Sequence, residues 1–435
     1  MIKRIFSSQF RRNFSSGMLV SSCDFILSMI ALPVYLHFLG YEKYGVWLVL
    51  TTVMSFSQVG NIGIGSALAK YVAENYAKYD IMSIEHYVTT AIYTLGISGS
   101  AVFLAILGFR SQIIFAFNLG SDNSTLALTL LPFIGILTLY SFIVKLIETT
   151  LSGLNRMDLA AYYRLAGRIT AISTSVALLY SGFGVTSLLI AAFLSELISH
   201  LFFLYAIRHI TLISFLRLKN INKNSLKHLL GFGSGVMGGM SVEMLFVPLN
   251  KLIISRYIGV GAIPVYDIAY NVAMNIRGLA ASGLGALMPE VSRLTVSAKA
   301  GIERIQHIYR QAIKITLLMG IPCFLLVFIL ATPLLTVWLQ DRFNAALPAM
   351  LRIMLFGAFL NLLSVPAYYM LMGLGLTNRL LLFSVIKALV NLAVIFTVIL
   401  TTASLPLSAI GWATVGGMAC STLYILWQNP KAIRI

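Results

Sequence analysis

Long apolar runs follow one another along almost the whole chain and are separated by short polar segments. A run of about 20 apolar residues has the length of a helix that crosses the hydrocarbon core of a bilayer. The runs are continuous rather than alternating, which indicates helices and not the strands of a membrane barrel. The pattern predicts an all-α membrane protein with about twelve transmembrane helices, at residues 17–38, 45–66, 87–109, 126–149, 160–181, 185–207, 231–255, 266–288, 312–333, 346–372, 380–401 and 406–427.

Composition supports a membrane location. Hydrophobic residues make up 59% of the 435 residues and charged residues only 10%, which is far from the composition of a soluble domain. The formal net charge of +17 could indicate a nucleic-acid partner. Basic residues in cytoplasmic loops of an inner-membrane protein explain it better, because no nucleic-acid-binding module accompanies the charge. We therefore expect no nucleic-acid partner.

The basic residues also predict the orientation of the spans. With both termini in the cytoplasm, 22 of the 31 lysines and arginines fall on the cytoplasmic side and 4 on the opposite side. This count assigns Arg156, Arg164 and Arg168 to the loop after the fourth span. The sequence thus predicts a multi-pass protein of the bacterial inner membrane with cytoplasmic N- and C-termini.

The chain divides into two similar halves. We predict a six-helix lobe at 1–207, a basic cytoplasmic connector at 208–228 and a second six-helix lobe at 229–435. Glycines recur at matching places, with a spacing of 219 residues (Gly40 to Gly259) and then 220 (Gly63 to Gly283). An even number of spans in each half predicts a parallel repeat, with its pseudo-twofold axis along the membrane normal.

Several segments resemble one known family. They are Pro33-x-Tyr35-x3-Leu39-Gly40-x-Glu42-x-Tyr44-Gly45-x-Trp47, NIGIGSALAKYVAE at 61–74, GLNR at 153–156, LNKLIISRYIG at 249–259 and VYDIAYNV at 265–272. Together they are similar to the polysaccharide-transport family, which includes the O-antigen flippases and belongs with the multidrug and lipid II exporters. The resemblance implies a two-lobed exporter that works by alternating access. It also places Asn250 where many relatives carry an acidic residue.

The resemblance implies the cargo and partners as well. The cargo would be an undecaprenyl-pyrophosphate-linked oligosaccharide, moved from the cytoplasmic to the periplasmic leaflet. The expected partners are this lipid-linked oligosaccharide, the surrounding membrane lipids, an O-unit polymerase and a chain-length regulator. We expect the protein to act as a monomer.

Basic residues inside the predicted spans are candidates for contact with an anionic headgroup. A charge at a helix centre costs roughly 2.5–3.5 kcal/mol on insertion scales, so such residues tend to have a function. The candidates are Arg277, Lys145, Lys251 and Lys387. Structural alternatives remain open: Lys145 could pair with Glu148, Arg277 with a neighbouring helix through Glu243, and the other two lysines could reach the interface.

Three acidic residues are candidates for binding a coupling proton or sodium ion: Asp24, Glu243 and Glu196. Asp24 shares a polar helix face with Ser21, Ser28 and Tyr35, which predicts that this face points away from lipid. Each acid could equally be the partner of a basic residue or a hydroxyl cluster. Candidates for sugar contact are Tyr270, Asn271, Asn275, Tyr140 and Asn391, although such aromatic residues often serve in packing.

Three functions compete. We predict a flippase for lipid-linked repeat units of O-antigen or a similar polysaccharide. A multidrug or cation antiporter should have an acidic and aromatic cavity, and the basic residues within spans argue against it. A membrane-embedded O-unit polymerase or glycosyltransferase should have a long periplasmic loop, which the sequence lacks. The chain has no GxSxG, Walker A or HExxH motif and no metal-ligand spacing, so we expect no enzyme activity, metal or cofactor.

Overall fold

The chain is helical throughout the part that the structure describes. The computed structural model describes residues 8–58, 62–210, 218–281, 284, 287, 291, 299–402 and 404–433, and these contain no strand. The contacts divide the chain into two compact units, Met1–Gly238 and Gly239–Ile435. The prediction of an all-α membrane protein is confirmed. The lobe and connector boundaries at 207 and 229 stay a prediction.

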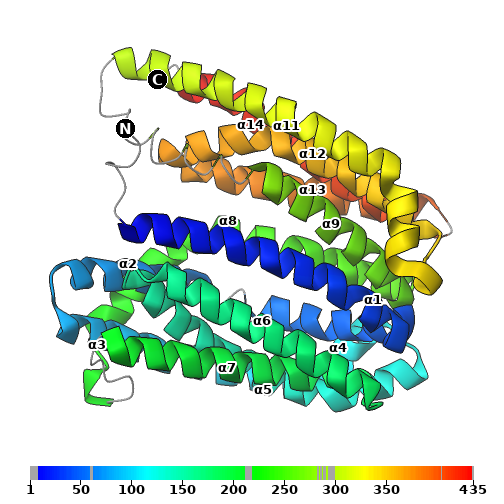
Figure 1. Ribbon diagram of the computed structural model, residues 1–435, viewed down its shortest axis with the longest axis horizontal. Coiled ribbons are helices and arrows are strands. Elements are labelled where there is room, and N and C mark those ends of the chain that lie inside the picture. The colour runs from blue at the N-terminus through cyan, green and yellow to red at the C-terminus, as the bar shows by residue number, and fades with distance from the viewer. Residues whose placement is uncertain are drawn as a thin grey trace. The chain divides into compact units, whose positions relative to one another are not determined.

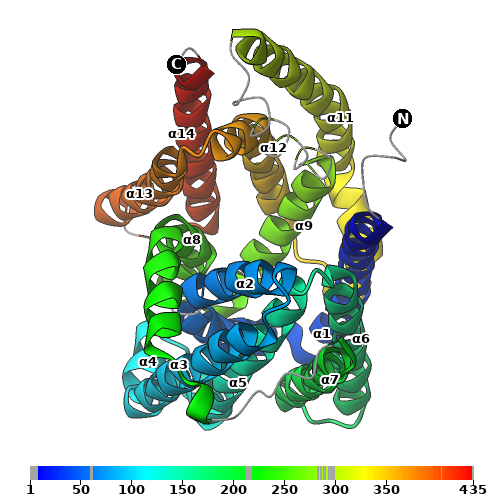
Figure 2. The ribbon, with the colours of Figure 1, turned by 90° about the vertical axis from the view of Figure 1, so that its left-hand side faces the viewer.

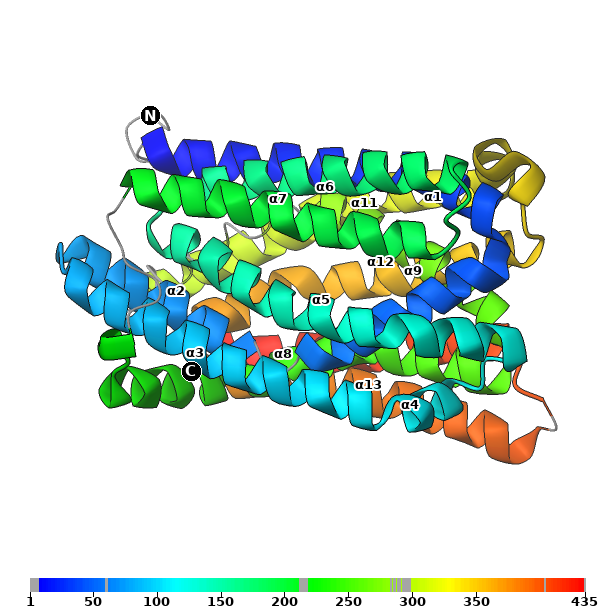
Figure 3. The ribbon, with the colours of Figure 1, turned by 90° about the horizontal axis from the view of Figure 1, so that it is seen from below.

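The first unit is a bundle of seven helices among its described residues, followed by a short 3-10 turn and the start of α8 (Figure 1). Its helices are α1 (Ser8–Gln58), α2 (Ile62–Ala77), α3 (Ile81–Gly108), α4 (Arg110–Phe117), α5 (Ser121–Gly153), α6 (Met157–Tyr180), α7 (Thr186–Ile210) and η3 (Leu218–Asn220). In Figure 2, α6 and α7 lie beside α1, while α2 and α3 lie against α5. Figure 3 shows α1, α6 and α7 running along one another.

The second unit takes up most of α8 and the remaining helices. These are α8 (Lys223–Tyr257), η4 (Val260–Ala262), α9 (Ile263–Ala281), α11 (Lys299–Leu339), η6 (Gln340–Arg342), α12 (Ala346–Gly373), α13 (Thr377–Thr401) and α14 (Leu407–Ile433). Helix α12 packs against α9, α11 and α14, and α13 packs against α14.

The twelve predicted spans correspond to eleven long described helices, because α1 contains two of them. Eight helices are long and apolar enough to cross a membrane by length and composition alone. The other three, α6, α8 and α9, carry polar and charged residues within their length. The short helices α2 and α4 were not predicted as separate elements.

Gly40 divides α1 into its two passes. A straight helix of 51 residues would be about 76 Å long, more than twice the hydrocarbon thickness of a bilayer. Gly40 interrupts it with φ 65° and ψ −179°, a backbone conformation that is open almost only to glycine. Gly259, 219 residues later, has φ 125° and ψ 156°, in the same glycine region. The first turn of each half therefore uses the same device.

Replacement of Gly40 by alanine should destabilise the protein by about 1–3 kcal/mol through backbone strain alone. No atom lies within 4 Å of the position that the new Cβ would take, so steric contact adds nothing. Gly96→Ala is the control, because Gly96 lies inside α3 with equally open space and has no positive φ. Thermal unfolding of the purified protein in detergent should show a loss for the first variant and none for the second.

A second pair of turns supports the internal repeat. Asn155 between α5 and α6 has φ 61°, and Gly375 between α12 and α13 has φ 75°. Three backbone hydrogen bonds hold the first turn, from the amides of residues 154, 155 and 156 to the carbonyls of residues 150, 152 and 151. The same three bonds recur in the second turn with every number raised by 220. The order of packing also repeats, since α3, α5, α7 and α6 contact in sequence as α11, α12, α14 and α13 do.

The end of the predicted connector is anchored on the first unit. Residues 211–217 lie outside the described residues. Beyond them, the Asn220 side chain donates to Glu85 Oε2 at 3.0 Å, and the Tyr87 hydroxyl lies 2.8 Å from His228 Nδ1. The ring of Tyr71 stacks on Tyr87 with centroids 4.8 Å apart. This part of the connector is therefore attached to α2 and α3 and is not a free tether.

Candidate functional site

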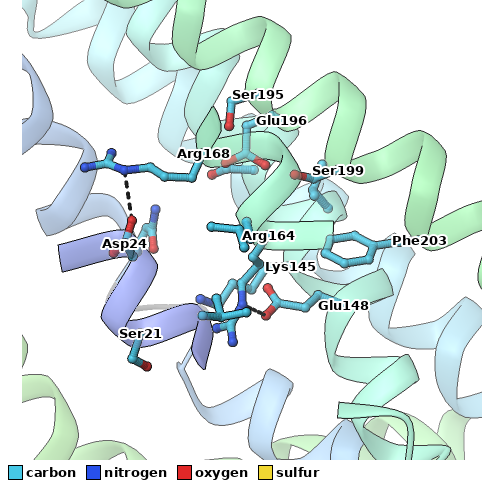
Figure 4. Close-up of a pocket in the computed structure, with 15 residues that line it drawn as sticks. Ser21, Asp24, Lys145, Glu148, Arg164, Arg168, Ser195, Glu196, Ser199 and Phe203 are labelled. Carbon is cyan, nitrogen blue, oxygen red and sulfur yellow. Dashed lines mark ion pairs between the residues drawn. The ribbon is translucent and has the colours of Figure 1, made fainter. Parts of the chain in front are cut away.

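A polar pocket of about 380 Å³ lies within the first unit, between α1, α5, α6 and α7 (Figure 4). Its six charged residues come from all four helices. Asp24 lies on α1, Lys145 and Glu148 on α5, Arg164 and Arg168 on α6, and Glu196 on α7. Three cations and three carboxylates thus meet in a bundle that is otherwise mainly apolar.

Two ion pairs cross this pocket from α6. Arg168 Nε lies 2.9 Å from Asp24 Oδ1, and Arg168 Nη2 donates to Ser28 Oγ at 2.7 Å. Arg164 Nε lies 3.3 Å from Glu148 Oε1. Residues four apart share one face of a helix, so α6 presents both guanidinium groups on the same side. Figure 4 shows them meeting their carboxylates from α1 and α5.

These contacts correct two expectations. Arg164 and Arg168 were assigned to a cytoplasmic loop, but both lie inside α6 and line the pocket. The excess of basic residues in the predicted cytoplasmic loops is smaller by these two. The possible local pair of Lys145 with Glu148 is not formed, because Glu148 pairs with Arg164 instead.

Lys145 and Glu196 remain as charged groups of the pocket without an ion pair to any described residue within 4 Å. Lys145 is exposed toward the pocket, and Glu196 is partly buried. The charged groups that act on Glu196 are Glu148 and Lys145. The pocket therefore offers one available ammonium group and one available carboxylate.

The predicted polar face of the first span packs against α6. Ser28 accepts from Arg168, and the Tyr35 hydroxyl lies 2.8 Å from Ser175 Oγ. Tyr140, a predicted sugar contact on α5, has its hydroxyl 2.7 Å from His200 Nδ1 on α7. The structure thus brings Asp24, Lys145 and Glu196 into one pocket and places Tyr140 in a contact between α5 and α7.

The second unit contains a buried network of four neutral polar residues. Asn250 Nδ2 donates to the Tyr266 hydroxyl at 2.8 Å and lies 3.2 Å from Thr414 Oγ1. Asn391 Nδ2 donates to Asn250 Oδ1 at 2.7 Å. All four side chains are buried, so Asn391 is engaged in helix packing.

This network gives a physical reason for an amide at position 250. Asn250 both donates and accepts hydrogen bonds here. An ionised carboxylate could accept the bond from Asn391 but could donate none to Tyr266 or Thr414. The departure from the acidic residue implied by the family resemblance is therefore matched by its surroundings.

Charged residues of the second unit form two further ion pairs. Lys251 Nζ lies 2.5 Å from Asp267 Oδ1, and both side chains are largely covered. Lys387 pairs with Glu243, and its ammonium lies 4.7 Å from the centre of the Phe246 ring. Both lysines are thus neutralised by carboxylates of the same unit.

Arg277 on α9 differs from these two lysines. Its Nε is buried and has no hydrogen-bond partner among the described residues. Glu243, Tyr270, Tyr368 and Tyr369 interact with it electrostatically. Arg277 therefore lies near the Glu243–Lys387 pair and the predicted sugar contact Tyr270, while Asn271 and Asn275 are exposed. The possible partnership of Arg277 with Glu243 is electrostatic only, since Glu243 pairs with Lys387.

Sequence reasoning missed Arg164 and Arg168 as pocket residues. A signal was present, because both numbers fall inside the predicted span 160–181 and their spacing of four places them on one face. A charged pair on one face of an otherwise apolar helix indicates an inward-facing polar surface.

The fold and the charged pockets inside its helical units define a multi-pass membrane transporter. A family model described as "Polysaccharide biosynthesis protein" matches residues 10–295, and the MatE model matches residues 237–399. The chain belongs to the polysaccharide biosynthesis protein family.

Individual relatives are more distant. A protein of Salmonella typhi described as "Putative O-antigen transporter" is 25% identical over 283 residues, and this match spans 62% of either chain's length. An inward-facing multidrug resistance MATE family transporter has a TM-score of 0.76 at 16% identity, with 98% of this chain and 95% of that chain covered. A MOP superfamily transporter from Pyrococcus furiosus, described as having a binding pocket of reverse polarity, has a TM-score of 0.67 at 16% identity, with 98% and 96% covered.

Proposed function

We propose that this transporter is a flippase for undecaprenyl-pyrophosphate-linked repeat units of O-antigen or a related polysaccharide. It would move them from the cytoplasmic to the periplasmic leaflet of the bacterial inner membrane by alternating access, with both termini in the cytoplasm. Family membership and the resemblance to an O-antigen transporter support a polysaccharide cargo. The proposal includes no catalytic step.

One observation carries the proposal: the pocket of the first unit holds a lysine that no carboxylate neutralises. A pyrophosphate must leave the hydrated headgroup region to cross the membrane, and it needs cations on its route. Lys145 is available for such a contact, since the nearby Glu148 is engaged by Arg164. In the second unit Arg277 is the corresponding candidate, because its Nε has no described partner.

The antiporter alternative fits these charges less well. A site for a cationic drug should carry more carboxylates than cations. The first-unit pocket has three of each, and two of its three carboxylates are already paired with arginines. Glu196 remains as the pocket's candidate for a coupling ion, beside the earlier candidates Asp24 and Glu243, which are both ion-paired.

Deletion of the gene in its host tests the proposal. We expect single, unpolymerised lipid-linked units to accumulate on the inner leaflet and surface polysaccharide to disappear. Wild-type protein should restore export, and Lys145→Ala should restore little of it although the protein still inserts. Lys227→Ala is the matched control, because Lys227 is an exposed lysine outside the pocket. Unchanged surface polysaccharide together with altered dye efflux would instead favour the antiporter.

A further inference from the structure

Each unit contains an ion pair at equivalent positions of the repeat. Asp24 on α1 pairs with Arg168 on α6 in the first unit, and Glu243 on α8 pairs with Lys387 on α13 in the second. The spacing is 219 residues for the acids (24 to 243) and 219 for the bases (168 to 387). Gly40 and Gly259 have the same spacing, so the fold repeats the ion pair together with the turn.

The two pairs differ in how accessible their cations are. The Lys387 side chain is only 3% exposed and lies over the Phe246 ring. The Arg168 side chain is 42% exposed and that of Asp24 is 54% exposed, and both line the pocket (Figure 4). A ligand could reach Arg168 from the pocket, whereas the protein itself covers Lys387.

The contact between Asp24 and Arg168 leaves much of the guanidinium group unused. Arg168 Nε lies 2.9 Å from Asp24 Oδ1 but makes no hydrogen bond with any described residue, because its N–H points elsewhere. Nη2 donates to Ser28. A guanidinium group has five N–H donors in a planar fork that matches the two oxygens of a phosphate or carboxylate. A bidentate anion would therefore bind Arg168 better than Asp24 does.

We propose that Asp24 acts as an internal substitute for the anionic group of the cargo. A phosphate or carboxylate that enters the pocket displaces the Asp24 carboxylate from Arg168 and is held by Arg168 and Lys145 together. This inference rests on the proposed function, and it adds Arg168 as a binding residue and Asp24 as its competitor. Exchange is favourable because an exposed ion pair contributes little by itself, and the incoming anion gains Lys145 as a second cation.

Binding of inorganic pyrophosphate to the purified full-length protein tests the exchange. In nanodiscs of zwitterionic lipid, isothermal titration should show about two- to fivefold tighter binding to Asp24→Asn than to the wild type, the range expected from loss of an exposed pair. Lys145→Gln should bind more weakly than the wild type. Arg168→Gln should remove the gain when it is combined with Asp24→Asn. If Asp24→Asn does not purify as a single species, Asp24→Ser removes the same carboxylate and carries the same expectation.

Glu74→Gln is the matched control for charge. It breaks the Lys70–Glu74 pair on α2, whose side chains are 41% and 49% exposed, and it removes one negative charge as Asp24→Asn does. We expect unchanged pyrophosphate binding. An equal gain in this control would reduce the effect to net charge and overturn the proposal, as would an Asp24→Asn variant that binds no tighter than the wild type, or pyrophosphate binding to none of the variants.

Two further ligands identify the source of the anion. Tighter binding of Asp24→Asn to pyrophosphate or to glucuronate supports a cargo anion, either the phosphate of its lipid carrier or an acidic sugar. A gain confined to nanodiscs containing phosphatidylglycerol would assign the site to membrane lipid and overturn the cargo role. If gene deletion causes no accumulation of lipid-linked units but Asp24→Asn still binds pyrophosphate more tightly, the proposed function fails and the anion exchange stands. The reverse result would sink the exchange alone.

Discussion

Replacement of Arg277 by methionine is expected to abolish polysaccharide export without lowering the stability of the protein. The Nε of Arg277 is buried and has no hydrogen-bond partner among the described residues. A buried polar atom in this state costs about 1–3 kcal/mol, so an apolar side chain of similar length should leave the free energy of unfolding unchanged or raise it. The loss of charge-assisted contacts with an anionic cargo, about 1.5–3 kcal/mol, should weaken binding roughly 10- to 150-fold.

Arg352 in the same unit provides the opposite control. Its Nε donates to the Phe328 carbonyl at 3.2 Å, its Nη2 donates to Thr332 Oγ1 at 3.0 Å, and its guanidinium lies over the Phe328 ring. Arg352→Met should therefore reduce stability slightly and leave export intact. Both variants are compared by export in the deletion strain and by thermal unfolding in detergent. A destabilised Arg277→Met protein that still exports normally would show that Arg277 is a structural residue.

The sequence predicted the helices well because bilayer thickness sets the length of an apolar span. It also predicted the repeat from Gly40 and Gly259, since few backbone conformations other than theirs require glycine. Helix ends were less accurate. A hydropathy pattern stops where charge begins, yet α5 continues through Lys145 and Glu148 to Gly153, and α6 contains Arg164 and Arg168. Charged residues that face a pocket look like loop residues when only hydropathy is considered.

The partners of the charged residues could not be predicted in the same way. Glu243 and Lys387 are separated by 144 residues, and no local rule connects them. The burial of Asn391 beside Asn250 likewise depends on how α8 and α13 pack. One route was available, however. The 219-residue spacing of Gly40 and Gly259 also relates Asp24 to Glu243 and Arg168 to Lys387, so the repeat itself connects the two ion pairs.

The Glu243–Lys387 pair should contribute strongly to the stability of the second unit. Glu243→Gln removes the carboxylate and leaves an ammonium group that is only 3% exposed, with the Phe246 ring as its remaining contact. Breaking a buried pair by removal of one partner typically costs about 3–5 kcal/mol. Because the Glu243 side chain is 48% exposed, we expect the lower end, about 3 kcal/mol, as a large drop in thermal stability in detergent.

A double-mutant cycle separates the pair from other effects. Lys387→Met removes the buried cation and leaves a half-exposed carboxylate, so it should cost less than Glu243→Gln, and the double variant should recover most of the loss. The equivalent pair of the first unit gives the matched comparison. Asp24→Asn should cost at most about 1 kcal/mol, because both of its side chains are accessible from the pocket. Equal losses for Glu243→Gln and Asp24→Asn would contradict the distinction between a covered pair that fixes α8 to α13 and an accessible pair that a ligand can open.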